Sequence, residues 1–178
     1  MGKAWMRMLA VAVALMALTL QAQQQDKTKR PSPSGTAEVT LKGKSVKIDY
    51  SRPSMKGRKI FGGVVPYGKV WRTGANEATA LTTAVDLNIG GAKVPAGSYT
   101  LYSLPTESGW KLIINKQTGQ WGTEYDEKQD LARVDLKTSK LDKTVEQFTI
   151  SFEKSGEDSA NLILEWENMR GSVVVKAQ

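Results

Sequence analysis

One stretch of the sequence, residues 50–79, gathers most of the side chains that could recognise a ligand. It reads YSRPSMKGRKIFGGVVPYGKVWRTGANEAT and mixes glycine, charge and aromatic residues, which is typical of neither a strand nor a plain linker. Arginine offers a planar fork of donors for a carboxylate, phosphate or sulfate, and aromatic faces can stack on a sugar ring or a cation. An asparagine and a glutamate would add the paired donor and acceptor that sugars need. The ligand-binding residues predicted from this pattern are Arg58, Tyr67, Trp71, Arg72, Asn76 and Glu77.

The same stretch allows a structural interpretation. In a β-sandwich whose long loop crosses an open end, Arg72 and Glu77 would form an ion pair that fastens the loop. Phe61, Tyr67 and Trp71 would then be the loop's own core. Paired charges are often structural, so fastening is the commoner role for any single residue. The number of arginines beside aromatic residues nevertheless favours a site for the stretch as a whole.

A second irregular stretch, residues 117–130, could flank the same pocket. It carries two aromatic residues beside three acids, namely Trp121, Tyr125, Glu124, Asp126 and Glu127. A glycoside hydrolase needs two carboxyl groups at a defined separation, which makes Glu124 or Asp126 the candidate partner for Glu77. Acidic loop residues are more often solvated than catalytic. We therefore expect a protein without catalytic residues, and keep a carboxylate-based hydrolase of envelope polymer or polysaccharide as an alternative.

The composition excludes several classes of site. The 178 residues include no cysteine and no histidine, which excludes disulfides, thiolate zinc sites, Ser–His–acid triads and HExxH zinc sites within this chain. The phosphate-binding motifs GxxxxGK(S/T) and GxGxxG are absent, and Asp126 and Asp130 do not fit an EF-hand. We therefore expect no cofactor and no metal. The net charge is +7, but no nucleic-acid motif occurs, so we expect no nucleic-acid partner.

The first 22 residues have the pattern of a secretory signal peptide. Lys3 and Arg7 precede an apolar run over residues 8–20, and the best cleavage position follows Ala22. An uncleaved anchor is the alternative. Residues 23–35 then form a polar lead-in with two prolines, which predicts a flexible segment. We expect a periplasmic or secreted protein that has no membrane contact after cleavage.

The remaining chain, residues 36–178, is predicted to be one β domain. Apolar and polar residues alternate with period two in many short segments, the clearest of which are 39–41, 46–50, 81–89, 98–104, 110–116, 131–137, 148–152, 162–166 and 172–176. No helical pattern exceeds one turn, at residues 142–147. The pattern predicts an all-β fold, an antiparallel β-sandwich of nine or ten strands, with a jelly-roll arrangement as one form. A closed barrel is the alternative.

Several motifs occur in an order that resembles a known family. The 50–79 stretch is followed by KVPAGSYTLYSLP, WKLIIN, WGTEYD and LILEWEN, at residues 93–105, 110–115, 121–126 and 162–168. In this order they resemble the secreted bacterial domain-of-unknown-function family numbered 2911. The resemblance implies an exported single-domain protein with residues 50–79 as its hallmark, and it implies no activity.

These observations predict an exported, non-catalytic β-sandwich that binds a polar, anionic or carbohydrate ligand through the 50–79 loop. A further alternative is an interaction module for another envelope protein, in which the loop is a packed lid. That alternative predicts no open pocket beside Arg72 and an exposed apolar patch elsewhere. The sequence carries no prediction of oligomeric state.

Overall fold

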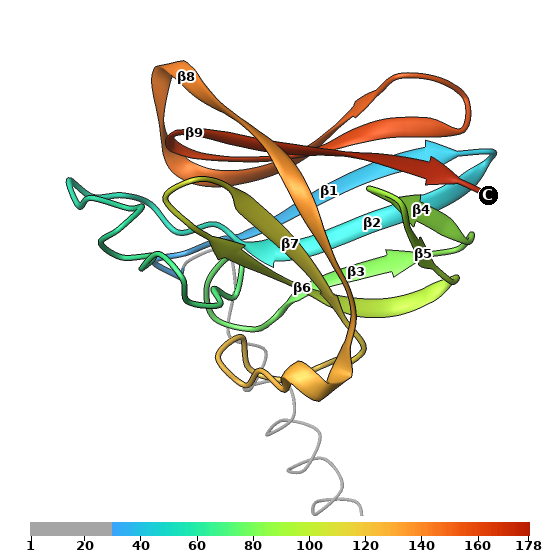
Figure 1. Cartoon of the computed structure of the whole chain (residues 1–178), viewed down its shortest axis with the longest axis horizontal. Coiled ribbons are helices and arrows are strands. Elements are labelled where there is room, and N and C mark those ends of the chain that lie inside the picture. The colour runs from blue at the N-terminus through green and yellow to red at the C-terminus, as the bar shows by residue number, and fades with distance from the viewer. Residues whose placement is uncertain (1–29) are drawn as a thin grey trace, which may run out of the picture. The chain divides into compact units, whose positions relative to one another are not determined.

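An antiparallel sheet of nine strands accounts for most of the fold (Figure 1). The structure, a computed structural model, describes residues 30–178. The predicted signal peptide and residues 23–29 of the predicted lead-in lie outside the described residues. The first strand begins at Ser34, slightly before the domain start predicted at Thr36. No segment of residues 30–178 forms a helix with the length and hydropathy that a membrane span requires.

The strands lie in the order β1-β2-β3-β6-β7-β8-β9-β4-β5. Their bounds are β1 (Ser34–Leu41), β2 (Lys44–Ser51), β3 (Thr79–Thr83), β4 (Leu87–Ile89), β5 (Ala92–Val94), β6 (Gly97–Pro105), β7 (Trp110–Asn115), β8 (Asp130–Lys154) and β9 (Ser159–Ala177). A single 3-10 turn, η2 (Glu127–Gln129), precedes β8, and residues 30–178 contain no α-helix. The all-β, antiparallel prediction is confirmed. Since β1 and β5 are the two edges, no hydrogen-bonded ladder among the described strands closes the sheet.

The chain changes its pairing partners where the sequence predicts one uninterrupted strand, at residues 81–89. The Thr83 hydroxyl donates to Val85 O at 2.6 Å and accepts from Val85 N at 3.3 Å, which makes a local turn. Before this turn β3 pairs with β2 and β6, whereas after it β4 pairs with β5 and β9. The prediction of one strand is therefore wrong, because the alternation of apolar residues continues through the turn.

The last two strands are longer than the alternation indicates. Four segments predicted as separate strands fall within β8 and β9, namely 131–137, 148–152, 162–166 and 172–176. The register of this pair shifts between Lys140 and Thr149, opposite Glu167, whose φ is +55°. Irregularities of this kind bend a strand without ending it. The helical turn predicted at 142–147 is wrong, since these residues form the irregular part of β8.

The distal part of the β8–β9 hairpin packs over the first two strands, as Figure 1 shows. The Tyr50 hydroxyl on β2 donates to Ile150 O at 3.2 Å and accepts from Ile150 N at 2.8 Å on β8. At the β1–β2 turn, Lys42 N donates to Glu157 O at 3.0 Å. These bonds join segments about a hundred residues apart in the chain and fix the hairpin over the sheet.

An aromatic cluster fills one end of the core between these layers. The Trp71 ring stacks on Trp166 with centroids 5.5 Å apart and planes at 20°, and its edge meets Phe148 at 4.9 Å. Trp166 and Phe148 are almost fully buried, whereas Trp71 is half-buried. The cluster therefore joins β8 and β9 to the loop that follows β2.

Candidate functional site

Main-chain hydrogen bonds hold the 50–79 loop at two places. Its first part runs beside β8, where Met55 N donates to Glu146 O at 2.8 Å and Phe148 N donates to Pro53 O at 2.9 Å. Its later part forms an antiparallel bridge to β6, in which Trp71 and Ser103 exchange two main-chain bonds of 2.7 and 2.9 Å. The loop is thus a fixed structure, as a preformed binding site requires.

The turn after Arg72 is fixed by side chains. Thr73 and Asn76 have φ values of +52° and +59°, conformations that a residue other than glycine seldom adopts. The Asn76 amide donates to Ser32 O at 3.1 Å and to Ser51 Oγ at 3.2 Å. At Gly74, φ is +156° and an added Cβ would lie 3.0 Å from Ser51 O, so only glycine fits. The sequence TGAN therefore builds a tight turn, and this turn fixes the position of the Arg72 backbone.

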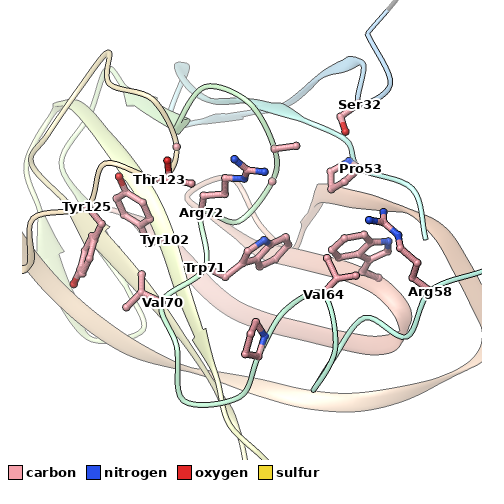
Figure 2. A pocket seen from close by; sticks show the side chains of 15 residues that line it. Ser32, Pro53, Arg58, Val64, Val70, Trp71, Arg72, Tyr102, Thr123 and Tyr125 are labelled. Carbon is pink, nitrogen blue, oxygen red and sulfur yellow. The ribbon is translucent and has the colours of Figure 1, made fainter. Parts of the chain in front are cut away.

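A cavity of about 430 Å³ opens beside Trp71, between the 50–79 loop and residues 122–125 (Figure 2). Aromatic rings come from both loops, from β6 and from β9, namely Trp71, Tyr125, Tyr102 and Trp166. Apolar side chains of the 50–79 loop extend this lining, namely Pro53, Val64, Pro66 and Val70. The volume is in the range of small-molecule sites, and the lining combines aromatic and apolar side chains with polar groups.

The cavity carries positive charge only. Of the described residues that line it, Arg58 and Arg72 are charged and none has a carboxylate. In Figure 2, Tyr102 and Tyr125 lie on one side of Arg72, and Arg58 lies on the opposite side near Val64. An anion that entered the cavity would therefore meet guanidinium groups and no competing acid.

Arg72 is held in place without a polar partner from residues 30–178. Its side chain is half-buried, and its guanidinium makes no hydrogen bond or ion pair with any residue of the described part of the chain. Its aliphatic stem lies on Gly122, where an added Cβ would approach Arg72 Cδ to 2.8 Å. The fixed backbone and this contact hold the Arg72 side chain at the cavity, and residues 30–178 provide no acceptor for its N–H donors.

Arg58 is fixed differently. Its Nε donates to Met55 O at 2.9 Å and its Nη2 donates to Ser54 O at 2.8 Å, within its own turn. The side chain is exposed at the rim, and its remaining donors are available to a ligand. Arg58 thus contributes a second, more solvated positive charge at the other side of the cavity.

The structure brings Arg58, Trp71 and Arg72 to the cavity, but not the other three predicted residues. Tyr67 is 41% exposed and its ring lies over Gly62 outside the lining. Asn76 holds the turn, and the Glu77 main chain forms a bridge with Trp121. Since no ion pair joins Arg72 to a carboxylate of residues 30–178, fastening by an Arg72–Glu77 pair does not occur.

Sequence reasoning missed Tyr102 and Trp166, which lie on β6 and β9. In strands that are buried on both faces, alternation does not reveal which aromatic ring reaches a cavity. Tyr125 was expected to flank the pocket, and it does line it. Gly122 lies in the WGTEYD motif, and an added Cβ there would lie 2.8 Å from Asn76 O, so the close approach of the two loops requires glycine.

Two acids of the second irregular stretch, residues 117–130, have structural roles. The Asp126 side chain accepts from Lys128 N at 3.0 Å and caps η2, and Glu127 pairs with Arg133 at 2.7 Å. The three carboxylates proposed for hydrolysis, Glu77, Glu124 and Asp126, do not line the cavity. Within residues 30–178, no group of three acids, histidines or cysteines is placed to hold a metal ion.

Two tyrosine hydroxyls next to the cavity are fully engaged. The Tyr125 hydroxyl donates to Asp130 Oδ2 at 2.7 Å and accepts from Arg133 Nη2 at 2.8 Å. The Tyr102 hydroxyl donates to Glu124 O at 3.0 Å, and burial raises the pKa of Tyr102. Burial, together with the hydrogen bond and negative charge of Asp130, raises the pKa of Tyr125 from 10.0 to about 12, against the opposing effect of Arg133.

The raised pKa of Tyr125 predicts a loss of stability at alkaline pH. Between pH 10 and about 12 the unfolded chain releases this proton while the folded protein keeps it, so the free energy of unfolding falls as pH rises. We expect urea denaturation midpoints to fall less in Tyr125→Phe than in the wild type between about pH 9 and about pH 11.5. Equal falls in the two proteins would show that Tyr125 titrates as it does in the unfolded chain.

Comparison with known proteins gives one match. The family model described as protein of unknown function (DUF2911) matches residues 32–175, which include every strand of the sheet except the last residues of β9. The searches of curated proteins and of solved structures found no match.

Proposed function

The chain belongs to the DUF2911 family of proteins of unknown function, and we propose that its 50–79 loop forms a binding site for an anionic ligand that carries a ring. The proposed occupant is a small polar molecule, for example an acidic sugar. Its anionic group would contact Arg72, and its ring would lie on Trp71 and Tyr125, the lining rings that are partly exposed. We further propose that the protein is exported through its first 22 residues and works as a binding protein.

The observation that carries this proposal is that no partner among residues 30–178 binds the guanidinium of Arg72, and that the described lining of its cavity has no acid. Removing a charge from water without a compensating partner costs free energy, even when burial is partial. A group held at such a cost is often functional. A carboxylate, sulfate or phosphate of a ligand would satisfy the guanidinium with two parallel hydrogen bonds, which makes an anion the occupant that the site fits.

A binding role agrees with the chemistry of the lining better than catalysis does. Hydrolysis of a glycan by the usual route needs two facing carboxyl groups, and the described lining residues supply none. The tyrosine hydroxyls at the cavity already have partners, and the raised pKa values of Tyr102 and Tyr125 disfavour their ionisation near neutral pH. These features support recognition of a ligand without a chemical step.

Calorimetric titration of Arg72→Ala tests the proposal. We expect the wild type to bind D-galacturonate at least about tenfold more tightly than neutral D-galactose, because only the acid can pair with the guanidinium. Arg72→Ala should weaken galacturonate binding by about 10–100-fold, the effect of losing one charge-assisted contact. Its free energy of unfolding should change by less than about 1 kcal/mol, since no protein partner is left unpaired.

Arg170→Ala is the matched control. Arg170 is ion-paired with Glu153 and Glu165 and does not line the cavity, so its removal should leave the affinity unchanged. Equal binding of galacturonate and galactose, or an Arg72→Ala affinity equal to that of the wild type, would overturn the proposed role of Arg72.

A further inference from the structure

The 50–79 loop carries more positive charge than one small anion requires. Between residues 53 and 75 the sequence has five basic side chains and no acidic one, namely Lys56, Arg58, Lys59, Lys69 and Arg72. Neither arginine is ion-paired, and none of the three lysines forms an ion pair among the described residues. The segment therefore adds three exposed lysines to the two arginines that line the cavity.

The carboxylates that touch this segment do not neutralise its side chains. Glu146 accepts from the main-chain N–H of Lys56 at 2.9 Å, and Glu167 accepts from the main-chain N–H of Ile60 at 3.3 Å. Both acids are thus directed at the backbone, where they hold the loop on β8 and β9. The lysine ammonium groups stay in solvent and are available to a partner of opposite charge.

On both loops, an exposed aromatic residue is next in sequence to residues that line the cavity. The described residues include four exposed large apolar side chains, and three of them belong to these loops, namely Val64, Tyr67 and Trp121. Trp121 is 46% exposed and precedes Gly122 and Thr123, which line the cavity. Tyr67 follows Pro66, which lines it on the other loop. Large rings left in water beside a cavity are candidate stacking platforms.

The backbones that carry these rings are fixed. Gly122 N donates to Asn76 O at 3.0 Å and Ala78 N donates to Gln120 O at 3.2 Å, on either side of the bridge between Glu77 and Trp121. Gly68 N donates to Pro105 O at 2.8 Å next to Tyr67. A ring on a rigid backbone loses little conformational entropy when a ligand stacks on it, so both positions suit ligand binding.

We propose that the site takes an acidic polysaccharide chain, with one sugar in the cavity and its neighbours on Trp121 and Tyr67. This inference rests on the proposed anion site and extends it from one sugar to several. The repeated acidic groups of such a chain match the basic side chains of the segment, and the apolar faces of its sugars match the separated rings. Carboxylate and sulfate groups offer arginine the same chemistry, so the acid of the polysaccharide is either a uronate or a sulfate ester.

The dependence of affinity on chain length tests this inference. The wild type is titrated with galacturonate oligomers of increasing length and with κ-carrageenan oligomers, which carry sulfate and no uronate. We expect the affinity for at least one series to rise by about tenfold or more from the shortest member to a chain of several residues, through the added stacking contacts. The series that shows the rise identifies the acid.

Variants distinguish the anion site at Arg72 from its extension to several sugars. Trp121→Ala and Tyr67→Ala should reduce the gain with chain length and leave monomer binding unchanged, whereas Arg72→Ala should weaken every length. Val174→Ala, which removes an exposed apolar residue of β9 away from these loops, is the matched control and should change neither the gain with chain length nor monomer binding.

Monomer binding that depends on Arg72 without any gain with length would overturn the polysaccharide inference and leave the anion site intact. Absence of binding at every length would overturn both, and tighter binding of a single-stranded oligonucleotide would assign the cations to another polyanion.

Discussion

Replacing Trp166 with alanine should lower the free energy of unfolding by about 3–5 kcal/mol. The side chain is 1% exposed, stacks on Trp71 and contacts Phe148 with ring centroids 5.8 Å apart. Its indole N–H donates to Glu146 O at 3.2 Å, so the substitution also removes a hydrogen bond. The loss combines the transfer free energy of a large apolar group with the cavity that remains between β9 and the 50–79 loop.

Urea denaturation of Trp166→Ala measures this loss. Trp121→Ala is the matched control, because it removes the same side chain from an exposed position, and it should cost less than about 1 kcal/mol. A shift of the midpoint with an unchanged slope would show that stability has changed and the compactness of the unfolded chain has not. Similar small losses in both variants would contradict the packing of β9 under the loop.

Replacing Tyr50 with phenylalanine should cost about 1–3 kcal/mol, although it removes a single oxygen atom. The hydroxyl both donates to and accepts from the main chain of Ile150, and the ring is 7% exposed. Both groups of Ile150 are bonded to this hydroxyl in a buried position, so phenylalanine would leave an N–H and a C=O without that partner. The expected cost is the desolvation of these groups.

Tyr67→Phe is the control for Tyr50→Phe. Its hydroxyl is on a ring that is 41% exposed, so its removal should change the free energy of unfolding by less than about 0.5 kcal/mol. Amide hydrogen exchange adds a local readout, because Ile150 N–H should exchange faster in Tyr50→Phe than in the wild type. A Tyr50→Phe variant as stable as the wild type would contradict the link between β2 and β8.

Local patterns in the sequence predicted the class of fold but not the connections between its parts. The alternation at Val46, Ile48 and Tyr50 correctly indicates one face of β2, because a strand with one buried face repeats every two residues. The same alternation cannot show that β3 and β4 belong to opposite parts of the sheet, since the turn at Thr83 is made by a single hydroxyl. Pairing between distant strands is a property of the whole chain.

The candidate site was predicted only in part, because local patterns do not show contacts between distant segments. Arg58, Trp71 and Arg72 lie in one continuous stretch whose composition is unusual, so the sequence indicates them directly. Tyr102 and Trp166 reach the cavity only because β6 and β9 pass beneath the loop. The ion pair of Arg72 with Glu77 was one of two interpretations of the stretch, and the salt bridges of residues 30–178 do not include it. The positive φ values at Thr73 and Asn76, between the two residues, are not visible in the sequence pattern.

The most direct measurement follows the Arg72 guanidinium itself. In a nitrogen-edited NMR spectrum the Arg72 Nε–H signal, assigned by its absence from Arg72→Ala, is recorded during titration with galacturonate and, separately, with neutral galactose. If Arg72 is the anion-binding group of the cavity, its signal shifts and saturates with galacturonate, and galactose moves it little. An Arg72 signal that stays unmoved through both titrations, at concentrations that shift or saturate other signals, would contradict the proposed site.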